Sequence, residues 1–251
     1  MEILAGTSGY SYKEWKGPFY PEKLPAKEML AYYAERLPTV EINNTFYRLP
    51  KTDVLATWAS QVPEGFRFVV KASRRITHFK RLKDAGDETG YLLRTLGTLG
   101  PKLGAVLFQL PPNLACDLER FDAFLDLLPA EGRFAFEFRH PSWHEEPGIR
   151  ERLSERNAAL VGVDGEDAPL EALPGAGDWG YLRLRRSDYA GKDLAAFVAR
   201  IRKAGWQQAF VFFKHEDAGA GPRMAAEFLA RAKPRKAASA RRRKPRAREA
   251  G

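Results

Sequence analysis

The chain has 251 residues, of which 44% are hydrophobic, 12% aromatic and 29% charged. No apolar run approaches the roughly 20 residues that span a bilayer, which argues against a membrane protein or a membrane partner. A single cysteine, Cys116, excludes an intrachain disulfide and a cysteine-based zinc site, and the opening MEILAG lacks the features of a signal peptide. We therefore expect a soluble, cytoplasmic protein.

Eight short runs rich in β-branched and aromatic residues predict strands, and amphipathic stretches between them predict helices. The expected strands cover residues 2–6, 39–42, 66–71, 104–110, 133–138, 159–164, 179–184 and 209–214. The expected helices cover residues 27–37, 52–61, 88–99, 118–128, 147–157, 193–204 and 222–232, and Thr52 and Asp193 open two of them. This alternation predicts an α/β fold with a single (β/α)8 barrel, the TIM-barrel architecture, over residues 1–232. An open, doubly wound sheet is the alternative, because alternation alone does not show closure.

The formal net charge of +9 resides at the carboxyl end of the chain. Residues 231–251 hold ten lysines and arginines and one acidic residue, so the rest of the chain is balanced. Residues 233–251 lack large apolar side chains, and we expect them to form a basic, disordered tail. Two interpretations of this tail stay open: non-specific contact with nucleic acid phosphates, or a solvated extension without a specific partner.

Polar residues gather at the carboxyl ends of the predicted strands. In RFAFEFRH the phenylalanines Phe134, Phe136 and Phe138 share one face, which we expect to pack outward on helices, and Glu137 and Arg139 share the other. The same alternation directs a set of side chains into the barrel mouth: Glu41, Asn43, Lys71, Gln109, Asp164, Tyr181, Arg183, Arg185 and either Lys214 or His215. This set predicts a polar pocket, since buried ions are costly unless they are paired or solvated. The alternative is a group of salt bridges that close the top of the barrel.

The stretch GTSGYSYKEW, from Gly6 to Trp15, resembles the surroundings of a catalytic serine. The nucleophile elbow G-x-S-x-G needs one more residue before the second glycine and a helix after it, whereas an aromatic loop follows here. We therefore expect Ser8 and Tyr10 to line the rim of a binding site, with Gly6 and Gly9 allowing a sharp turn after the first strand.

The loop after the third strand, ASRRITHFKRLKD, carries five lysines and arginines and His78. Together with the cationic residues of the mouth, this loop predicts a site for a small anionic ligand, because guanidinium groups bind phosphate and carboxylate bidentately. A solvated basic surface is the alternative interpretation. Neither the phosphate-binding loop motif nor the dinucleotide glycine motif occurs, so no nucleotide cofactor is indicated.

Glu41 and Glu137 are the candidates for proton transfer, one as base and one as acid, in an order that the sequence does not fix. His140 is a further acid–base candidate or a cap of the strand end, and Trp143 would stack on a ligand or fill space. A divalent metal held by Glu41, Glu137, Asp164 and a histidine is another alternative, which no HxH or HExxH spacing supports.

Several of these stretches together resemble the YecE-like family, bacterial and archaeal proteins of unknown function. The resemblance rests on GTSGYSYKEWKGPFYP, VEINNTFYRLP, FVVKASRRITH, LGAVLFQLPP, AFEFRHPSW, YLRLR and FVFFKHED, which extend over the chain up to about Leu229. It implies a TIM-like barrel with a cleft at the carboxyl ends of the strands, and it brings no accepted reaction.

Three functions of different classes follow from these observations. The first is an enzyme that binds a phosphate- or nucleotide-like anion in the mouth and performs acid–base or hydrolytic chemistry with Glu41 and Glu137. The second is a non-catalytic module that binds nucleic acid through the basic loop and tail. The third is a barrel that senses a small ligand or serves as a scaffold.

Overall fold

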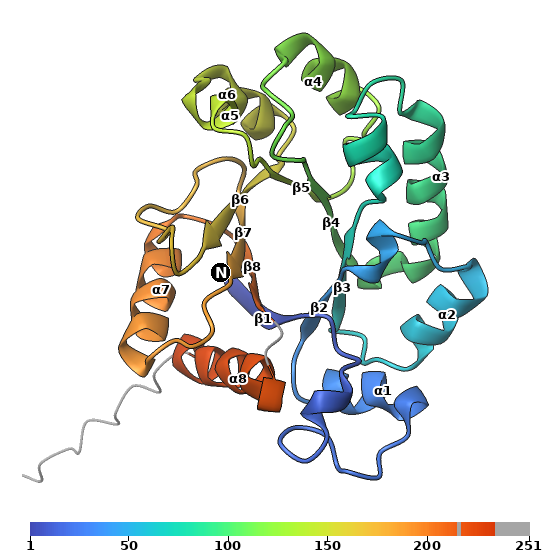
Figure 1. The fold of residues 1–251 in the computed structure, drawn as a ribbon, viewed down its shortest axis with the longest axis vertical. Helices are drawn as coiled ribbons and strands as arrows, with labels where there is room; N and C mark the ends of the chain where they lie inside the picture. Colours follow the sequence, from blue (N-terminus) through green and yellow to red (C-terminus); the bar gives the residue numbers. More distant parts are fainter. Residues whose placement is uncertain (215–216, 234–251) are drawn as a thin grey trace, which may run out of the picture.

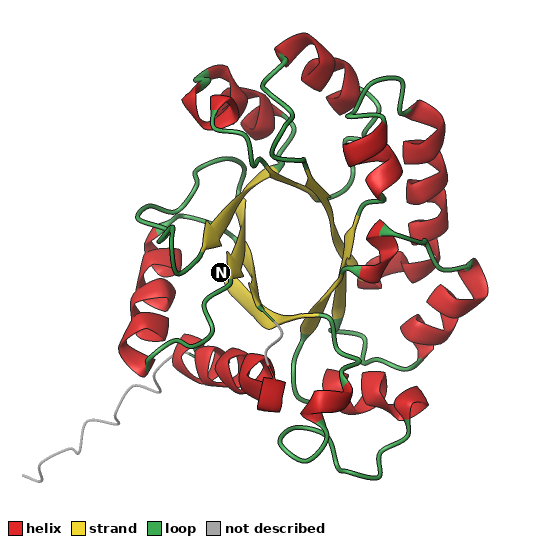
Figure 2. Cartoon of the chain, viewed as in Figure 1, coloured by secondary structure: helices red, strands yellow, loops and turns green. Residues whose placement is uncertain are grey.

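The computed structural model describes residues 1–214 and 217–233. Within them eight parallel strands close into a barrel in sequence order, and β1 pairs with both β2 and β8. The helices surround this ring of strands (Figures 1 and 2). The predicted (β/α)8 barrel is thereby confirmed over the open sheet, because the first strand has a hydrogen-bonded neighbour along both edges. The predicted tail, except for Lys233, lies outside the described residues.

All eight predicted strands are present, with ends shifted by at most two residues. The strands are β1 (Glu2–Ser8), β2 (Thr39–Ile42), β3 (Arg67–Lys71), β4 (Leu103–Gln109), β5 (Phe134–Glu137), β6 (Ala159–Asp164), β7 (Trp179–Leu184) and β8 (Gln208–Phe213). The α-helices are α1 (Met29–Ala34), α2 (Thr52–Ser60), α3 (Gly86–Leu96), α4 (Leu118–Leu125), α5 (Ser142–Glu145), α6 (Gly148–Glu155), α7 (Gly191–Lys203) and α8 (Ala220–Ala232). No helix in this described part of the chain is long and apolar enough to span a membrane.

The start of α1 and the roles of Thr52 and Asp193 differ from the prediction. The segment expected to be helical from residue 27 begins as a 3-10 turn, Ala26–Glu28, before α1. Thr52 is the first residue of α2 and not its cap, because the extended Lys51 precedes it and no side chain caps the helix. In α7, Asp193 lies within the first turn, where its carboxylate accepts a hydrogen bond from the Ala190 N–H at 3.2 Å. It therefore stabilises the helix start from inside the helix.

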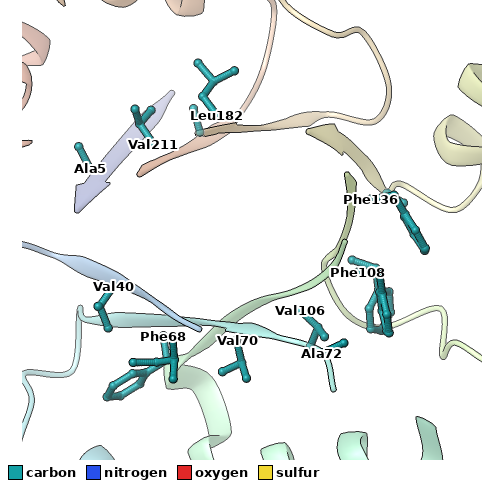
Figure 3. Close-up of a cluster of buried hydrophobic side chains, with 14 of the residues drawn as sticks. Ala5, Val40, Phe68, Val70, Ala72, Val106, Phe108, Phe136, Leu182 and Val211 are labelled. Carbon is teal, nitrogen blue, oxygen red and sulfur yellow. The ribbon is translucent and has the colours of Figure 1, made fainter. Parts of the chain in front are cut away.

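Apolar side chains form one layer on each side of the strands. Phe108 and Phe136 point away from the barrel interior toward the helices (Figure 3), and the Phe136 ring lies 5.1 Å from that of Phe121 in α4. Phe134 and Phe138 belong to the same outer layer, which confirms their predicted orientation. The interior layer consists of Leu4, Val69, Ala105, Leu107, Ala135, Ala159, Val161, Trp179, Tyr181, Phe210 and Phe212. Apolar packing fills the barrel below the carboxyl ends of the strands, so polar groups collect above it.

The two glycines at β1 serve different purposes. Gly9 has φ = 91°, a conformation that favours glycine, and it follows the strand where the chain turns. Gly6 lies within β1, and a side chain there would overlap the backbone oxygen of Thr39 on the neighbouring strand. Only Gly9 therefore makes the predicted turn, whereas Gly6 permits close packing between β1 and its surroundings.

Candidate functional site

A buried ion triad, formed by Glu41, Arg183 and Glu137, closes the barrel interior at the carboxyl ends of the strands. The exposed fractions of these residues are 0%, 3% and 4%, respectively. Arg183 Nη2 lies 2.8 Å from Glu41 Oε1, and Arg183 Nη1 lies 2.7 Å from Glu137 Oε2. One guanidinium from β7 thus joins carboxylates from β2 and β5, which the alternation predicted to face inward. For these three residues, the structure therefore agrees with the alternative interpretation, in which salt bridges close the top of the barrel.

Glu41 has a full set of hydrogen-bond donors. Ser8 Oγ donates at 2.8 Å and Asn43 Nδ2 at 2.9 Å to Oε1, and the Tyr181 hydroxyl donates at 2.6 Å to Oε2. Burial would raise the pKa of Glu41, but the charge of Arg183 and these donors together lower it below its ordinary value. Ser8, 5% exposed, therefore donates its hydroxyl to a buried carboxylate.

Glu137 is also held as a carboxylate. Its Oε1 accepts hydrogen bonds from Gln109 Nε2 at 2.8 Å and from Arg139 Nε at 3.1 Å. Burial opposes the charge, but Arg183, Arg139 and the Gln109 hydrogen bond lower the pKa of Glu137 to about 2. Neither carboxylate of the triad holds a proton at neutral pH. The hypothesis that one of the two glutamates acts as a general acid therefore lacks support.

Lys71, at the mouth, has a pKa lowered toward neutral pH. Its Nζ donates to Gln109 Oε1 at 2.7 Å and lies 4.1 Å from the centroid of the Phe46 ring. Burial and the charge of Arg183 lower the pKa of Lys71 to about 8, although Glu137 and Glu41 oppose the shift. Gln109 thus connects the lysine to Glu137 through its two amide atoms.

Further cations lie around Lys71. Arg139 keeps 43% of its side chain exposed, and the half-buried Arg185 side chain forms no hydrogen bond or ion pair with any described residue. Burial and the nearby charge of Arg183 lower the pKa of Arg185. With Lys71 and Arg183 these groups provide four cations beside the two carboxylates of the triad. Their surplus of positive charge favours an anion in the mouth.

His78 belongs to this site, although the sequence placed it only within a basic loop. Its ring meets the Phe46 ring edge-on at 4.8 Å, and its Nδ1 lies 2.9 Å from Thr77 Oγ1. Burial and the charges of Lys71 and Arg139 lower the pKa of His78, so the neutral imidazole prevails at neutral pH. The loop's π-helical turn, Arg75–Phe79, directs it there, and no short sequence motif marks such a turn.

Asp164 does not join the mouth, contrary to the prediction. Val161 and Val163 of β6 contribute to the interior layer, so Asp164 faces the opposite side. It pairs with Arg186 at 2.8 Å and accepts a hydrogen bond from the Tyr189 hydroxyl at 2.7 Å. In a wholly apolar strand the sequence does not reveal which set of alternating residues faces inward.

Three other residues that the sequence predicts for the site, Trp143, His140 and Lys214, contact neighbouring parts of the fold. Trp143 is 2% exposed, stacks on Phe138 at 4.5 Å and donates its indole N–H to the Leu114 carbonyl oxygen, so it fills space. His140 Nδ1 lies 2.8 Å from Ser142 Oγ, at the start of α5. Lys214 follows β8 with the spacing of the inward-facing Phe210 and Phe212, and its charge adds to the Ser187 hydrogen bonds that lower the pKa of Glu166, whereas His215 lies outside the described residues.

Tyr10 lines a small pocket beside the mouth, of about 220 Å³, together with Asn43 and Trp58. The Oδ1 atom of Asn43 is buried and has no hydrogen-bond partner among the described residues, while its Nδ2 donates to Glu41. Tyr10 also packs against Tyr33 and Trp58, with ring centroids 6.3 Å and 6.5 Å apart. Asn43 therefore connects this pocket to the triad.

A converging set of metal ligands is not found within residues 1–214 and 217–233, since no three histidine, cysteine or acidic side chains approach one another suitably. Glu41 and Glu137 are joined through Arg183, and Asp164 lies on the other side of its strand. The metal alternative based on these three acids therefore does not fit the geometry.

Comparison with known proteins gives a consistent family assignment. Residues 4–249 match the family described as "Protein of unknown function DUF72". The UPF0759 protein YecE of Escherichia coli is 33% identical over 140 residues, 54% of this chain and 52% of YecE, so the match spans about half of that relative. The UPF0759 protein YunF of Bacillus subtilis is 28% identical over 82% of this chain and 73% of its own length.

Solved structures agree with this assignment. A DUF72 family protein of Thermotoga maritima superimposes with a TM-score of 0.80 at 25% identity, covering 92% of this chain and 98% of its own. A DUF72 family protein of Enterococcus faecalis reaches a TM-score of 0.75 at 20% identity, covering 92% and 95%, and shares the fold. The chain therefore belongs to the DUF72 family, a family of unknown function.

Proposed function

We propose that this chain is an enzyme that binds a small phosphate- or carboxylate-bearing ligand at the barrel mouth, with Lys71 as its acid–base group. The observation that carries the proposal is the surplus of cations around the buried ion triad. The Arg185 side chain makes no hydrogen bond or ion pair with any described residue, and Lys71 bonds only to a neutral amide oxygen. Such groups gain most from an anion that satisfies them.

The triad supports this role by position and charge. Both glutamates stay ionised, which keeps Arg183 protonated, and Arg183 in turn repels a proton from Lys71. Gln109, fixed by Glu137, orients the lysine. In this proposal Glu41 and Glu137 position other residues, and Lys71 exchanges the proton. Lys71 thus takes the acid–base role that the sequence predicted for the two glutamates.

The depressed pKa of Lys71 suits proton transfer near neutrality. With a pKa of about 8, about a tenth of the lysine is neutral at pH 7 and available as a base, and the remainder is available as an acid. Barrel enzymes place such groups at the carboxyl ends of their strands, where Lys71 ends β3. The substrate class that fits is an anion with an acidic C–H or O–H group next to its charged group.

Calorimetric titration with inorganic phosphate tests the binding half of the proposal. We expect Arg185→Gln to weaken phosphate binding about tenfold, because a charge-assisted contact is lost. Arg94→Gln is the matched control, since Arg94 is exposed on α3 and its side chain forms no hydrogen bond or ion pair with the described residues. Equal affinity of the wild type and the Arg185 variant, or no phosphate binding at low salt, would overturn the anion site.

Turnover tests the catalytic half. A panel of phosphorylated and carboxylated metabolites is screened with the wild type, and any reaction found is repeated with Lys71→Met. We expect the variant to lose the reaction and the wild-type rate to change with an apparent pKa near that of Lys71. Retained turnover in the variant refutes the role of the lysine. Tight phosphate binding with no reaction in the whole panel would instead favour the ligand-sensing alternative.

A further inference from the structure

Two exposed aromatic rings lie at the rim of the barrel, outside the site already described. Tyr47 and Phe79 are each 68% exposed, and they belong to the loops after β2 and β3. The guanidinium carbon of Arg74 lies 5.2 Å from each ring centroid, so one arginine is positioned against both rings. We call Tyr47, Arg74 and Phe79 the rim platform. The only other exposed aromatic side chain among the described residues is Tyr91, on α3.

The charge around the platform is positive, although Glu88 lies close enough to Arg75 to interact with its charge. Arg48 and Arg75 are exposed neighbours of the platform in the chain, and neither they nor Arg74 pairs with a carboxylate of any described residue. Lys80, further along the same loop, differs because Glu88 neutralises it at 2.8 Å. One guanidinium group against two flat rings, with two further arginines next to them in the chain, matches a ligand that offers flat apolar faces and anionic groups in alternation.

The backbone of the loop after β3 holds Phe79 outward in a defined position. The π-helical turn Arg75–Phe79 is followed by Arg81, Leu82 and Asp84, whose φ angles are 50°, 68° and 48°. These left-handed conformations are costly for residues other than glycine and are concentrated at functional sites. Leu82 is buried at 3% exposure and anchors the turn, so the exposure of Phe79 belongs to an ordered loop.

We propose that the rim platform binds single-stranded nucleic acid, with unpaired bases stacked on Tyr47 and Phe79 and phosphates held by Arg48, Arg74 and Arg75. A base stacks on an aromatic ring whatever its identity, so the surface has no sequence preference. Double-stranded nucleic acid fits poorly, because its bases already stack on one another. An acidic peptide would satisfy the arginines and leave the two rings exposed. This binding goes beyond the proposed reaction and does not require Lys71.

The test uses the full chain and a short oligothymidylate that contains one 2-aminopurine, whose fluorescence reports stacking. We expect the wild type to change this fluorescence on binding. We expect Tyr47→Ala and Phe79→Ala each to weaken binding at least about fivefold, since one base–aromatic stack is lost per ring. Both rings are exposed, so these variants should keep the fold. Tyr91→Ala is the matched control and should bind like the wild type.

Three readouts separate the platform from other basic parts of the chain. Purely electrostatic contacts outside the platform weaken steeply with salt and leave the 2-aminopurine fluorescence unchanged. Stacking on the platform changes this fluorescence, and Tyr47→Phe, which keeps a ring, should restore the change that Tyr47→Ala loses. The double alanine variant should still bind inorganic phosphate, so failure of the platform and failure of the anion site are distinguishable. Unchanged oligonucleotide affinity in the double variant, an equal loss in Tyr91→Ala, or equally tight binding of a duplex would overturn the proposal.

Discussion

Replacing Arg183 by methionine is the most direct test of how the mouth is held together. The change removes the cation that joins Glu41 and Glu137 and leaves a shorter, apolar side chain. Two carboxylates, 0% and 4% exposed, then remain without their central partner. We expect the folded state to lose stability because an uncompensated buried charge is far more costly than a missing surface contact.

The magnitude follows from what remains around each carboxylate. Removing one partner of a buried ion pair costs about 3–5 kcal/mol. Glu41 would still receive hydrogen bonds from Ser8 and Tyr181, and Glu137 would keep its bonds from Gln109 and Arg139, so we place the loss at the lower end, about 3 kcal/mol. Urea denaturation followed by tryptophan fluorescence measures this loss.

The loss should also depend on pH in a defined direction. In the wild type the pKa of Glu137 is about 2, below its ordinary 4.5, so its stabilising effect is present above pH 4.5 and lost as the pH falls toward 2. Without Arg183, only Arg139 and the Gln109 hydrogen bond oppose burial, so the folded-state pKa of Glu137 rises above its wild-type value. The variant therefore gains less stability than the wild type as the pH rises from about 2. We expect a larger difference from the wild type at about pH 7 than at about pH 3.

Two comparisons complete the experiment. Arg94→Met, an exposed control, should change stability by less than about 0.5 kcal/mol. The triple variant with Glu41→Gln, Arg183→Met and Glu137→Gln should recover much of the loss, because it leaves no unpaired charge in the barrel. A loss below about 1 kcal/mol for Arg183→Met, or the same loss at both pH values, would refute the account of the triad.

Three further changes probe other parts of the argument. The pKa of Lys71 is about 8 in the folded protein, against an ordinary value of 10.5. Between these pH values the unfolded state binds more protons, so the stability of the wild type should rise with pH relative to that of Lys71→Met. Thermal denaturation across that range checks this, and parallel curves would contradict it. Gly6→Ala should cost about 2 kcal/mol or more in urea denaturation, because the added methyl group overlaps the Thr39 carbonyl; a change under 0.5 kcal/mol would count against it. Asp164→Asn should cost about 1–3 kcal/mol through its contact with Arg186 while phosphate affinity stays constant, and a tenfold fall in that affinity would return Asp164 to the mouth.

The sequence carried enough information to predict the strands and, for most of them, which side chains point into the barrel and which point outward. In RFAFEF the large apolar and the charged residues alternate, so the outward face of Phe136 and the inward face of Glu137 are both apparent. The same holds for Glu41 and Arg183, whose inward orientation the structure confirms. Such alternation is a local property of one strand, and it survives any arrangement of its neighbours.

Only the tertiary structure determined what these inward residues do. The sequence does not contain the distance between β2, β5 and β7 across the barrel, and that distance makes Arg183 the partner of both glutamates. The lowered pKa of Lys71 also depends on the closed barrel, because burial and the charge of Arg183, from a distant segment, cause the shift. The prediction places Asp164 on the wrong face because residues 159–163 of β6 are apolar on both faces. The sequence therefore does not distinguish the inward face of this strand from the outward one. The sequence by itself determined strands and faces through local periodicity, whereas charge pairing and acid–base character depend on distances that exist only once the barrel has closed.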